Sequence, residues 1–109
     1  MNLSRNEVSA TRSPWDGTDK ISSWLEDKAK EGWFVDSFSF KMFNSVISFH
    51  FVRCKPVQAT IVYEEVSSIL WNQKNYEDEL PEDCRFVWKA ENYAIYTDTI
   101  PELVDDDIK

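Results

Sequence analysis

A helix that stops at a glycine and leads into aromatic strands constrains the fold of this chain more than any other feature. After Asp16, apolar residues recur at the three-and-four spacing of one helix face, and Asp16 or Thr18 is predicted to cap the first turn. Gly32 is predicted to end this helix, because glycine readily adopts the left-handed conformation found just past helix ends. The buried face is predicted to consist of Ile21, Trp24, Leu25 and Ala29.

Two runs rich in Phe, Val and Ile follow the helix, at residues 33–40 and 45–53. They predict an antiparallel hairpin that turns near residues 42–44. The second run alternates between apolar and polar side chains, which predicts one face against the core and one face away from it. The core-facing residues are Ile47, Phe49 and Phe51, and the others are Ser48 and His50.

The remainder of the chain repeats this plan weakly. A third strand is predicted at residues 58–63, and a second helix at about residues 65–76, because Val66-Ser67-Ser68-Ile69-Leu70 echoes Ile21-Ser22-Ser23-Trp24-Leu25. Aromatic-rich runs at residues 84–88 and 93–97 predict a second hairpin. The predicted fold class is α+β: an antiparallel sheet of about five strands, two helices packed on one face and a more polar face opposite, interpreted as a degenerate duplicated helix-hairpin unit.

Length and composition predict one domain. The chain has 109 residues, of which 42% are hydrophobic and 15% aromatic, enough for a single core. We divide it into an N-terminal segment (1–15), a near-neutral half (16–63), an acidic half (64–100) and an acidic tail (101–109). The sequence lacks a signal-peptide pattern and a membrane-length apolar run, which predicts a cytoplasmic protein without membrane contact. Cys54 and Cys84 are predicted to be free, buried thiols.

Charge is distributed unevenly along the chain. Eight basic and seven acidic residues precede Glu64, whereas four basic and thirteen acidic residues follow from Glu64 onward, so the two parts carry +1 and −9 of a net charge of −8. This balance disfavours direct binding to DNA or RNA, which are polyanions. Carboxylates on a rigid frame can instead imitate the charges of a nucleic-acid backbone, which predicts a basic protein surface as the partner. The same charge is equally typical of a surface that only confers solubility.

The predicted partner-binding site combines acidic residues of the second half with tryptophans that would anchor a partner if exposed. The acidic runs lack the oxygen spacing and turn glycine of a calcium-binding loop, so no metal site is predicted there. Trp15, which follows Pro14 in a polar segment, is a further candidate anchor. The predicted partner-binding residues are Glu77, Asp78, Glu79, Glu82, Asp83, Trp71, Trp88, Asp105, Asp106 and Asp107.

Groups suited to catalysis are scarce. His50 is the single histidine, which excludes two-histidine metal sites, and its place on the polar face of a strand favours a surface role. A Cys54–His50 dyad is rejected because four residues of extended chain separate the two by about 13 Å. Gly17 and Gly32 are isolated, so no phosphate-binding loop is predicted. We therefore predict a non-enzyme with no catalytic residue, metal or cofactor.

The stretch Trp24-Leu25-Glu26-Asp27-Lys28-Ala29-Lys30-Glu31-Gly32-Trp33, followed by a hairpin ending in Phe51-Val52-Arg53-Cys54-Lys55-Pro56 and a strand with Tyr63, resembles small uncharacterised bacterial and phage domains. Those families share a helix ending in Lys-Glu-Gly-Trp and a hairpin ending in a Phe-x-basic step. The resemblance covers about residues 20–63 and rests on packing: a glycine that ends a helix, then a core tryptophan. It implies a shared fold and carries over no catalytic residue. The acidic second half departs from the charge balance of those families.

Three function classes remain. The favoured one is a non-enzymatic inhibitor or regulator that occupies the nucleic-acid-binding surface of a basic partner, as phage or mobile-element anti-defence proteins do. The alternative is a sensory or regulatory domain that holds a small apolar ligand among Phe38, Phe49 and Phe51, or that self-associates through exposed strand edges, so monomer and homodimer both stay open. The third is an enzyme using carboxylates alone, which requires two acids with perturbed pKa values in one cleft.

Overall fold

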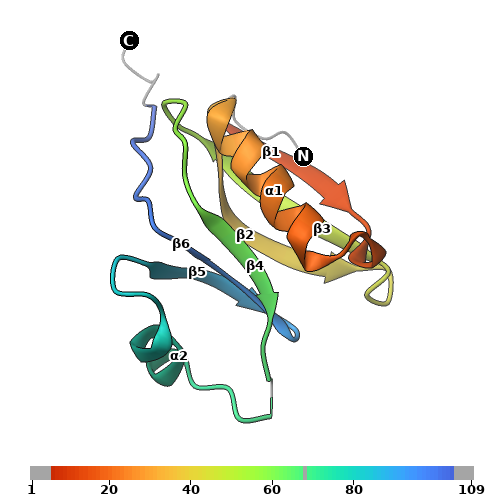
Figure 1. The fold of residues 1–109 in the computed structure, drawn as a ribbon. Coiled ribbons are helices and arrows are strands. Elements are labelled where there is room, and N and C mark those ends of the chain that lie inside the picture. The colour runs from red at the N-terminus through yellow and green to blue at the C-terminus, as the bar shows by residue number, and fades with distance from the viewer. Residues whose placement is uncertain (1–5, 68, 105–109) are drawn as a thin grey trace.

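The computed structural model describes residues 6–67 and 69–104, and within these ranges it contains six strands and two α-helices arranged as an α+β fold (Figure 1). The strands form two separate three-stranded antiparallel sheets. The elements are β1 (Glu7–Arg12), the 3₁₀ turn η1 (Pro14–Asp16), α1 (Thr18–Lys30), β2 (Trp33–Lys41), β3 (Val46–Arg53), β4 (Ile61–Glu65), α2 (Gln73–Glu79), β5 (Arg85–Ala90) and β6 (Tyr93–Thr97).

Each half of the chain builds one sheet by the same plan of strand, helix and hairpin. The strand orders are β1-β3-β2 and β4-β6-β5, so the first strand of each half pairs with its last. The predicted single sheet of five strands is therefore wrong. The segment Glu7–Arg12, for which no strand was predicted, completes the first sheet, while β4 begins the second. The predicted helix-hairpin repeat is present as topology, with a leading strand added to each half.

Helix α1 agrees with its predicted span, but its first turn is capped differently. Gly17 occupies the cap position and no side chain accepts a hydrogen bond there. Asp16 instead pairs with Arg12 at 3.1 Å, and Ser13 caps the 3₁₀ turn by accepting from the Trp15 amide. At the other end Gly32 has φ +96°, and a Cβ there would lie 3.1 Å from the Cys54 carbonyl oxygen, so only glycine fits without strain.

The predicted position of the second helix, at residues 65–76, is wrong. Glu65 ends β4, residues 66–72 form no helix where they are described, and α2 spans only Gln73–Glu79. Ser68 of the predicted echo lies outside the described residues, and its neighbours Ile69 and Leu70 are exposed. Apolar spacing alone therefore misled the prediction, because those side chains meet no core.

The core lies between α1 and the inner faces of both sheets. The stripe Ile21, Leu25 and Ala29 is buried, and Trp24 packs edge-on against Phe49 and Phe51 with ring centroids 5.5 and 5.6 Å away. The alternation predicted for the second aromatic run is confirmed: Ile47, Phe49 and Phe51 are fully buried, whereas Ser48 and His50 are half-buried.

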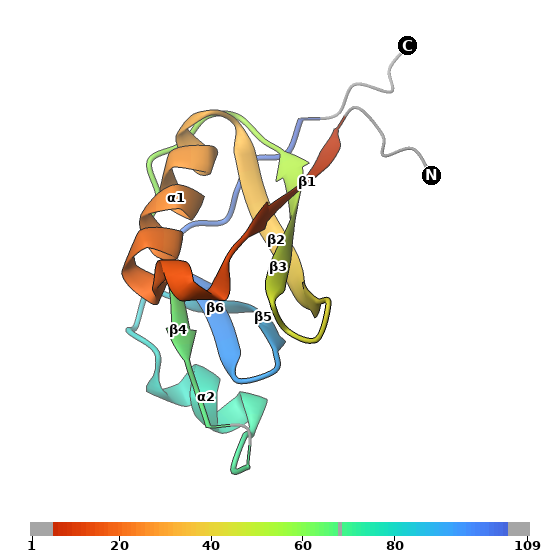
Figure 2. The ribbon, with the colours of Figure 1, turned by 90° about the vertical axis from the view of Figure 1, so that its right-hand side faces the viewer.

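The two helices do not share a sheet face. The apolar stripe of α1 joins the core, whereas α2 buries no residue and lies against the outer face of the second sheet (Figures 1 and 2). Tyr76 of α2 contacts Tyr96, which neighbours the core residue Ile95 in β6 and so points the opposite way. The prediction that both helices cover one face is thus wrong.

Side chains of α1 satisfy the free edge of β4. The Glu26 Oε2 atom accepts from the Ile61 amide at 3.0 Å, and the Ser22 Oγ atom accepts from the Tyr63 amide at 2.9 Å. Ser22 Oγ also lies 3.4 Å from the Tyr63 carbonyl, to which it donates. Because residues one helical turn apart meet strand residues two apart, the helix takes the place of a neighbouring strand and holds the second sheet against the first half.

The β2–β3 turn falls where it was predicted and is strained. Met42, Phe43 and Asn44 all have φ between +53° and +66°. Of these residue types only asparagine favours this region, and each of the others costs about 1–2 kcal/mol there. Ser45 holds the turn, since its amide donates to Lys41 and Met42 carbonyls and its hydroxyl donates to Met42 at 2.6 Å.

The start of the predicted acidic tail packs on the first sheet. The Lys55 amide donates to the Glu102 carbonyl at 2.9 Å, and the Val104 amide donates to the Arg53 carbonyl at 3.1 Å. Leu103 and Cys54 form a β-bridge. Residues 101–104 therefore form part of the fold, whereas Asp105, Asp106 and Asp107 lie outside the described residues.

Candidate functional site

Helix α2 and the turn after it carry the described acidic residues predicted to bind a partner. Asn72 begins the helix, and its side-chain oxygen accepts from the Asn75 amide at 3.1 Å. Leu80 ends it, and Pro81 follows. This local chemistry of an asparagine cap and a terminal proline explains a short helix in a polar stretch.

Tyr76 fixes α2 to the second sheet. Its ring lies 5.0 Å from that of Trp71, 6.0 Å from Phe86 and 6.5 Å from Tyr96. Its hydroxyl donates to Glu64 Oε2 at 2.7 Å. Burial, with the hydrogen bond and charge of Glu64, raises the pKa of Tyr76 far above its ordinary value, so this hydroxyl stays a donor.

A pocket of about 420 Å³ opens between α2 and the segment that precedes it. Trp71 and Tyr76 supply aromatic surface, and Glu64 and Glu79 supply carboxylates. Leu70, which is 82% exposed, also lines it, and its neighbour Ile69 is 91% exposed. An aromatic wall beside carboxylates suits a cationic side chain, because the ring faces and the negative charge attract it together.

Among the described acidic residues that were predicted from the sequence, Glu79 lines this pocket and the other four do not. Glu77, Asp78, Glu79, Glu82 and Asp83 are all exposed, on α2 and in the turn before β5. Of these, Asp78 pairs with Lys74 at 3.4 Å, and Glu77 accepts from Gln73 at 3.2 Å. Such exposed contacts exchange easily with a partner's groups, because each is worth less than about 1 kcal/mol.

The structure separates the two predicted tryptophans. Trp71 packs on Phe86 at 6.0 Å and lies under the Lys89 ammonium at 5.2 Å, on the outer face of the second sheet. Trp88 pairs with Ile95, a core residue, and so belongs to the opposite face, where it is 44% exposed. Trp71 and the acidic residues form one candidate site, and Trp88 is not part of it.

His50 occupies a different setting, on the polar face of the first sheet. Its Nδ1 lies 2.6 Å from Asp36 Oδ1 and its Nε2 lies 3.2 Å from Glu7 Oε1. The hydrogen bond to Asp36 does most to raise the pKa of His50, and Glu7 raises it further. The ring thus ties β1 and β2 to β3, a structural role consistent with the predicted surface position.

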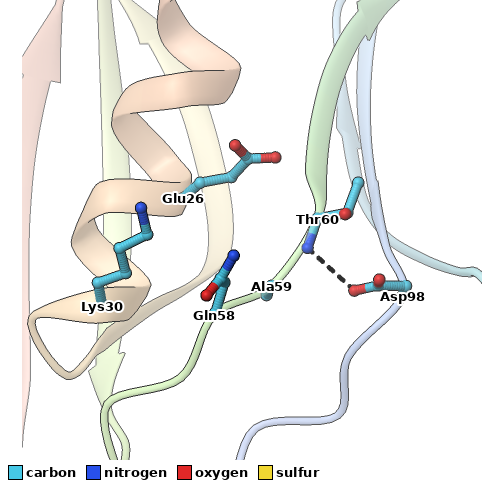
Figure 3. A pocket seen from close by; sticks show the side chains of 6 residues that line it. All are labelled: Glu26, Lys30, Gln58, Ala59, Thr60 and Asp98. Carbon is cyan, nitrogen blue, oxygen red and sulfur yellow. Dashed lines mark hydrogen bonds between the residues drawn. The ribbon is translucent and has the colours of Figure 1, made fainter.

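A polar hollow of about 480 Å³ lies between α1 and the start of β4 (Figure 3). Its two carboxylates are engaged by backbone: Glu26 by the Ile61 amide and Asp98 by the Thr60 amide, both at 3.0 Å. The hydrogen bond from the Thr99 hydroxyl, and next the one from the Thr60 amide, lower the pKa of Asp98. Both carboxylates therefore hold the edge of β4, and this hollow is a structural feature.

The residues proposed to line an apolar ligand cavity pack against one another instead. Phe38 and Phe49 have ring centroids 5.5 Å apart, and each lies 5.5–5.8 Å from the Tyr63 ring. Phe51 packs on Trp24. Contacts this close fill the space among these rings, which does not favour the small-ligand alternative.

Sequence reasoning missed Glu64, Tyr76 and Leu70. The local signal for the true helix was Asn72 before a polar run that ends at Pro81, which places Tyr76 one turn after the cap. The Glu64–Tyr76 hydrogen bond joins β4 to α2 and depends on the sheet, so no local pattern marks it.

Cys54 is buried and Cys84 half-buried, and both are free thiols, as predicted except for the exposure of Cys84. Over the described ranges, no group of three or more His, Cys, Asp and Glu side chains is placed to hold a metal ion. None of the helices in those ranges is long and apolar enough to cross a membrane.

Comparison with protein-family models, curated proteins and solved structures returned no match, and the resemblance to small bacterial and phage domains stays a prediction.

Proposed function

We propose that this protein is a non-enzymatic binding module whose acidic α2 face occupies a basic, nucleic-acid-binding surface of a partner protein. The observation that carries this proposal is the aromatic pocket rimmed by Glu64 and Glu79 and continued by the exposed acidic residues of α2 and the turn after it. In this role the protein inhibits or regulates an enzyme that handles DNA or RNA, as anti-defence proteins of phages and mobile elements do.

The arrangement supports both parts of such recognition. Five exposed carboxylates between Glu77 and Asp83 raise the local negative potential, which speeds encounter with a basic surface. The Trp71 and Tyr76 rings then offer a site for one inserted Arg or Lys side chain. Nearby exposed Ile69 and Leu70 add apolar area that becomes buried on binding.

The test is affinity capture from a bacterial lysate with three versions of the immobilised full-length protein. The site variant is Glu77→Gln, Asp78→Asn and Glu79→Gln. The matched control is Asp19→Asn, Asp27→Asn and Glu31→Gln, which removes the same charge from exposed positions on α1 and at its C-terminal cap. Equal charge change on a different surface separates a specific site from a general effect of acidity.

Basic nucleic-acid enzymes retained by the wild type and the control, released by double-stranded DNA, and lost with the site variant would support the proposal. Retention of the same proteins by all three versions would contradict it, because binding would then be independent of the α2 carboxylates.

A further inference from the structure

A second surface lies at the β2–β3 turn, apart from α2 in Figure 1. The β2–β3 turn and η1 are at the right-hand end of Figure 1, and α2 is at its lower left. This end presents Phe43, which is 105% exposed, and Trp15, which is 91% exposed. Met42 beside them is also exposed. Large apolar side chains gathered this way mark an interaction surface.

The turn conformation sets Phe43 apart from an ordinary surface residue. Phe43 adopts φ +57° between two other left-handed residues, yet no packing holds its ring, which is fully exposed. Glycine would adopt this conformation without strain. A strained aromatic residue that contributes no packing to its own fold points to a contact made outside it.

A pocket of about 280 Å³ opens beside the exposed Phe43 side chain, which we call the knob. Its apolar surface comes from Pro14, Trp15, Phe40 and Tyr93, and Asn44 of the turn also lines it. A cavity of about 150 Å³ is enough to hold a benzene ring. The pocket therefore has room for a phenylalanine side chain, but Phe43 of the same chain projects into solvent.

We propose that this end is a self-association surface, in which Phe43 of each copy inserts into the pocket of a second copy. A knob and a pocket that are neighbours on one surface are self-complementary under a two-fold axis, as a symmetric dimer requires. The charges beside the knob and the pocket are complementary. Lys41, which is exposed, flanks the knob, and Glu91, which is also exposed, lines the pocket. Neither side chain forms an ion pair with another described residue. In the dimer each Lys41 meets the partner's Glu91.

Area and net charge make this a weak, reversible dimer. Two aromatic side chains per copy bury about 150–250 Å² each, or about 600–1,000 Å² for the pair, which is below the about 1,200 Å² of stable specific interfaces and typical of weak, transient ones. Each chain carries −8, so charge repulsion between copies opposes tight association. Self-association of this kind leaves α2 free and does not depend on the function proposed for it.

The test is sedimentation velocity of the full-length protein from about 10 μM to about 1 mM, a range that covers weak dimers. The wild type is expected to shift from 12.8 kDa toward twice that mass. Phe43→Gly and Trp15→Ser are each expected to weaken dimerisation at least tenfold, with Phe43→Gly retaining or raising the melting temperature. Leu70→Ser, an equally exposed apolar position on the α2 side, is the matched control and is expected to dimerise like the wild type.

Charge exchange provides the second readout. Lys41→Glu alone places two glutamates together at each contact and is expected to weaken the dimer, and the double variant Lys41→Glu/Glu91→Lys is expected to restore it. A wild type that stays monomeric at about 1 mM would overturn the proposal. A dimer that persists in Phe43→Gly, or one disrupted by Leu70→Ser instead, would also overturn it.

Discussion

Replacing Glu26 with alanine tests how the second sheet is attached to the rest of the fold. The Glu26 carboxylate accepts from the amide of Ile61, a residue that is fully buried. A hydrogen bond to a charged group contributes about 1.5–3 kcal/mol to stability. Glu26 also lines the open hollow of Figure 3, so water can reach part of the freed site, and we expect a loss of about 1–2 kcal/mol for Glu26→Ala.

The measurement is urea unfolding followed by tryptophan fluorescence, with thermal melting as a second probe. A loss of about 1–2 kcal/mol corresponds to a fall in melting temperature of about 4–8 °C for a domain of this size. Glu31→Ala is the matched control, since Glu31 caps the end of the same helix and its side chain makes an exposed pair with Lys28 at 3.7 Å. Glu26→Gln keeps an acceptor and is expected to lose about half as much as Glu26→Ala.

Equal stability of the Glu26→Ala and Glu31→Ala variants would refute the reasoning. The free edge of β4 would then be satisfied by something other than α1. The comparison is direct because each variant removes one glutamate, from α1 or from the cap at its end.

Three further predictions follow from single residues. The pKa of His50 is raised, so its charged form stabilises the fold fully below the ordinary pKa of about 6.5, and this stabilisation is lost as pH rises through the raised value. The urea midpoint of the wild type is therefore expected to fall with rising pH more than that of His50→Gln. Parallel profiles of the two proteins would contradict this prediction. Gly32→Ala is expected to cost about 1–3 kcal/mol in a thermal melt, because of its positive φ and the Cys54 carbonyl 3.1 Å from the added Cβ; an unchanged melting temperature would exclude that strain. The pKa of both thiols is raised, so burial decides their order of reaction: a thiol reagent is expected to modify half-buried Cys84 in the native protein and buried Cys54 only after unfolding. Mass spectrometry reports the order, and equal rates would contradict the prediction.

Local patterns predicted the first half of the fold well. In helix α1 and in the β2–β3 hairpin, apolar residues recur with the period of a helix or a strand, and the face that they form packs in the core. Gly32 marks the boundary between the two elements. The alternation in β3 was readable because its inner face is fully buried. Sequence and structure agree in segments whose regularly spaced apolar residues are the residues that become buried.

The remaining elements depend on partners distant in the chain. Strand β1 has a polar sequence, and it becomes a strand by pairing with β3 about forty residues later. Helix α2 carries no buried residue, so it has no apolar stripe to reveal it, while Ile69 and Leu70 of the apolar echo face solvent. The candidate site was found through its acidic residues, but its pocket depends on the long-range contact of Tyr76 with Glu64.

The most direct test of the proposed function is an NMR titration of the ¹⁵N-labelled protein with a short arginine-rich peptide at low and moderate salt. Shift changes concentrated at the Trp71 indole, Tyr76 and residues 77–83, and weakened by salt, are the predicted result. The exposed acidic residues Asp19 and Asp27 of α1, with Glu31 at its C-terminal cap, serve as an internal reference for non-specific attraction. Changes at α1 as large as those at α2, or no change at Trp71, would contradict the claim that the α2 face is built to receive a basic partner.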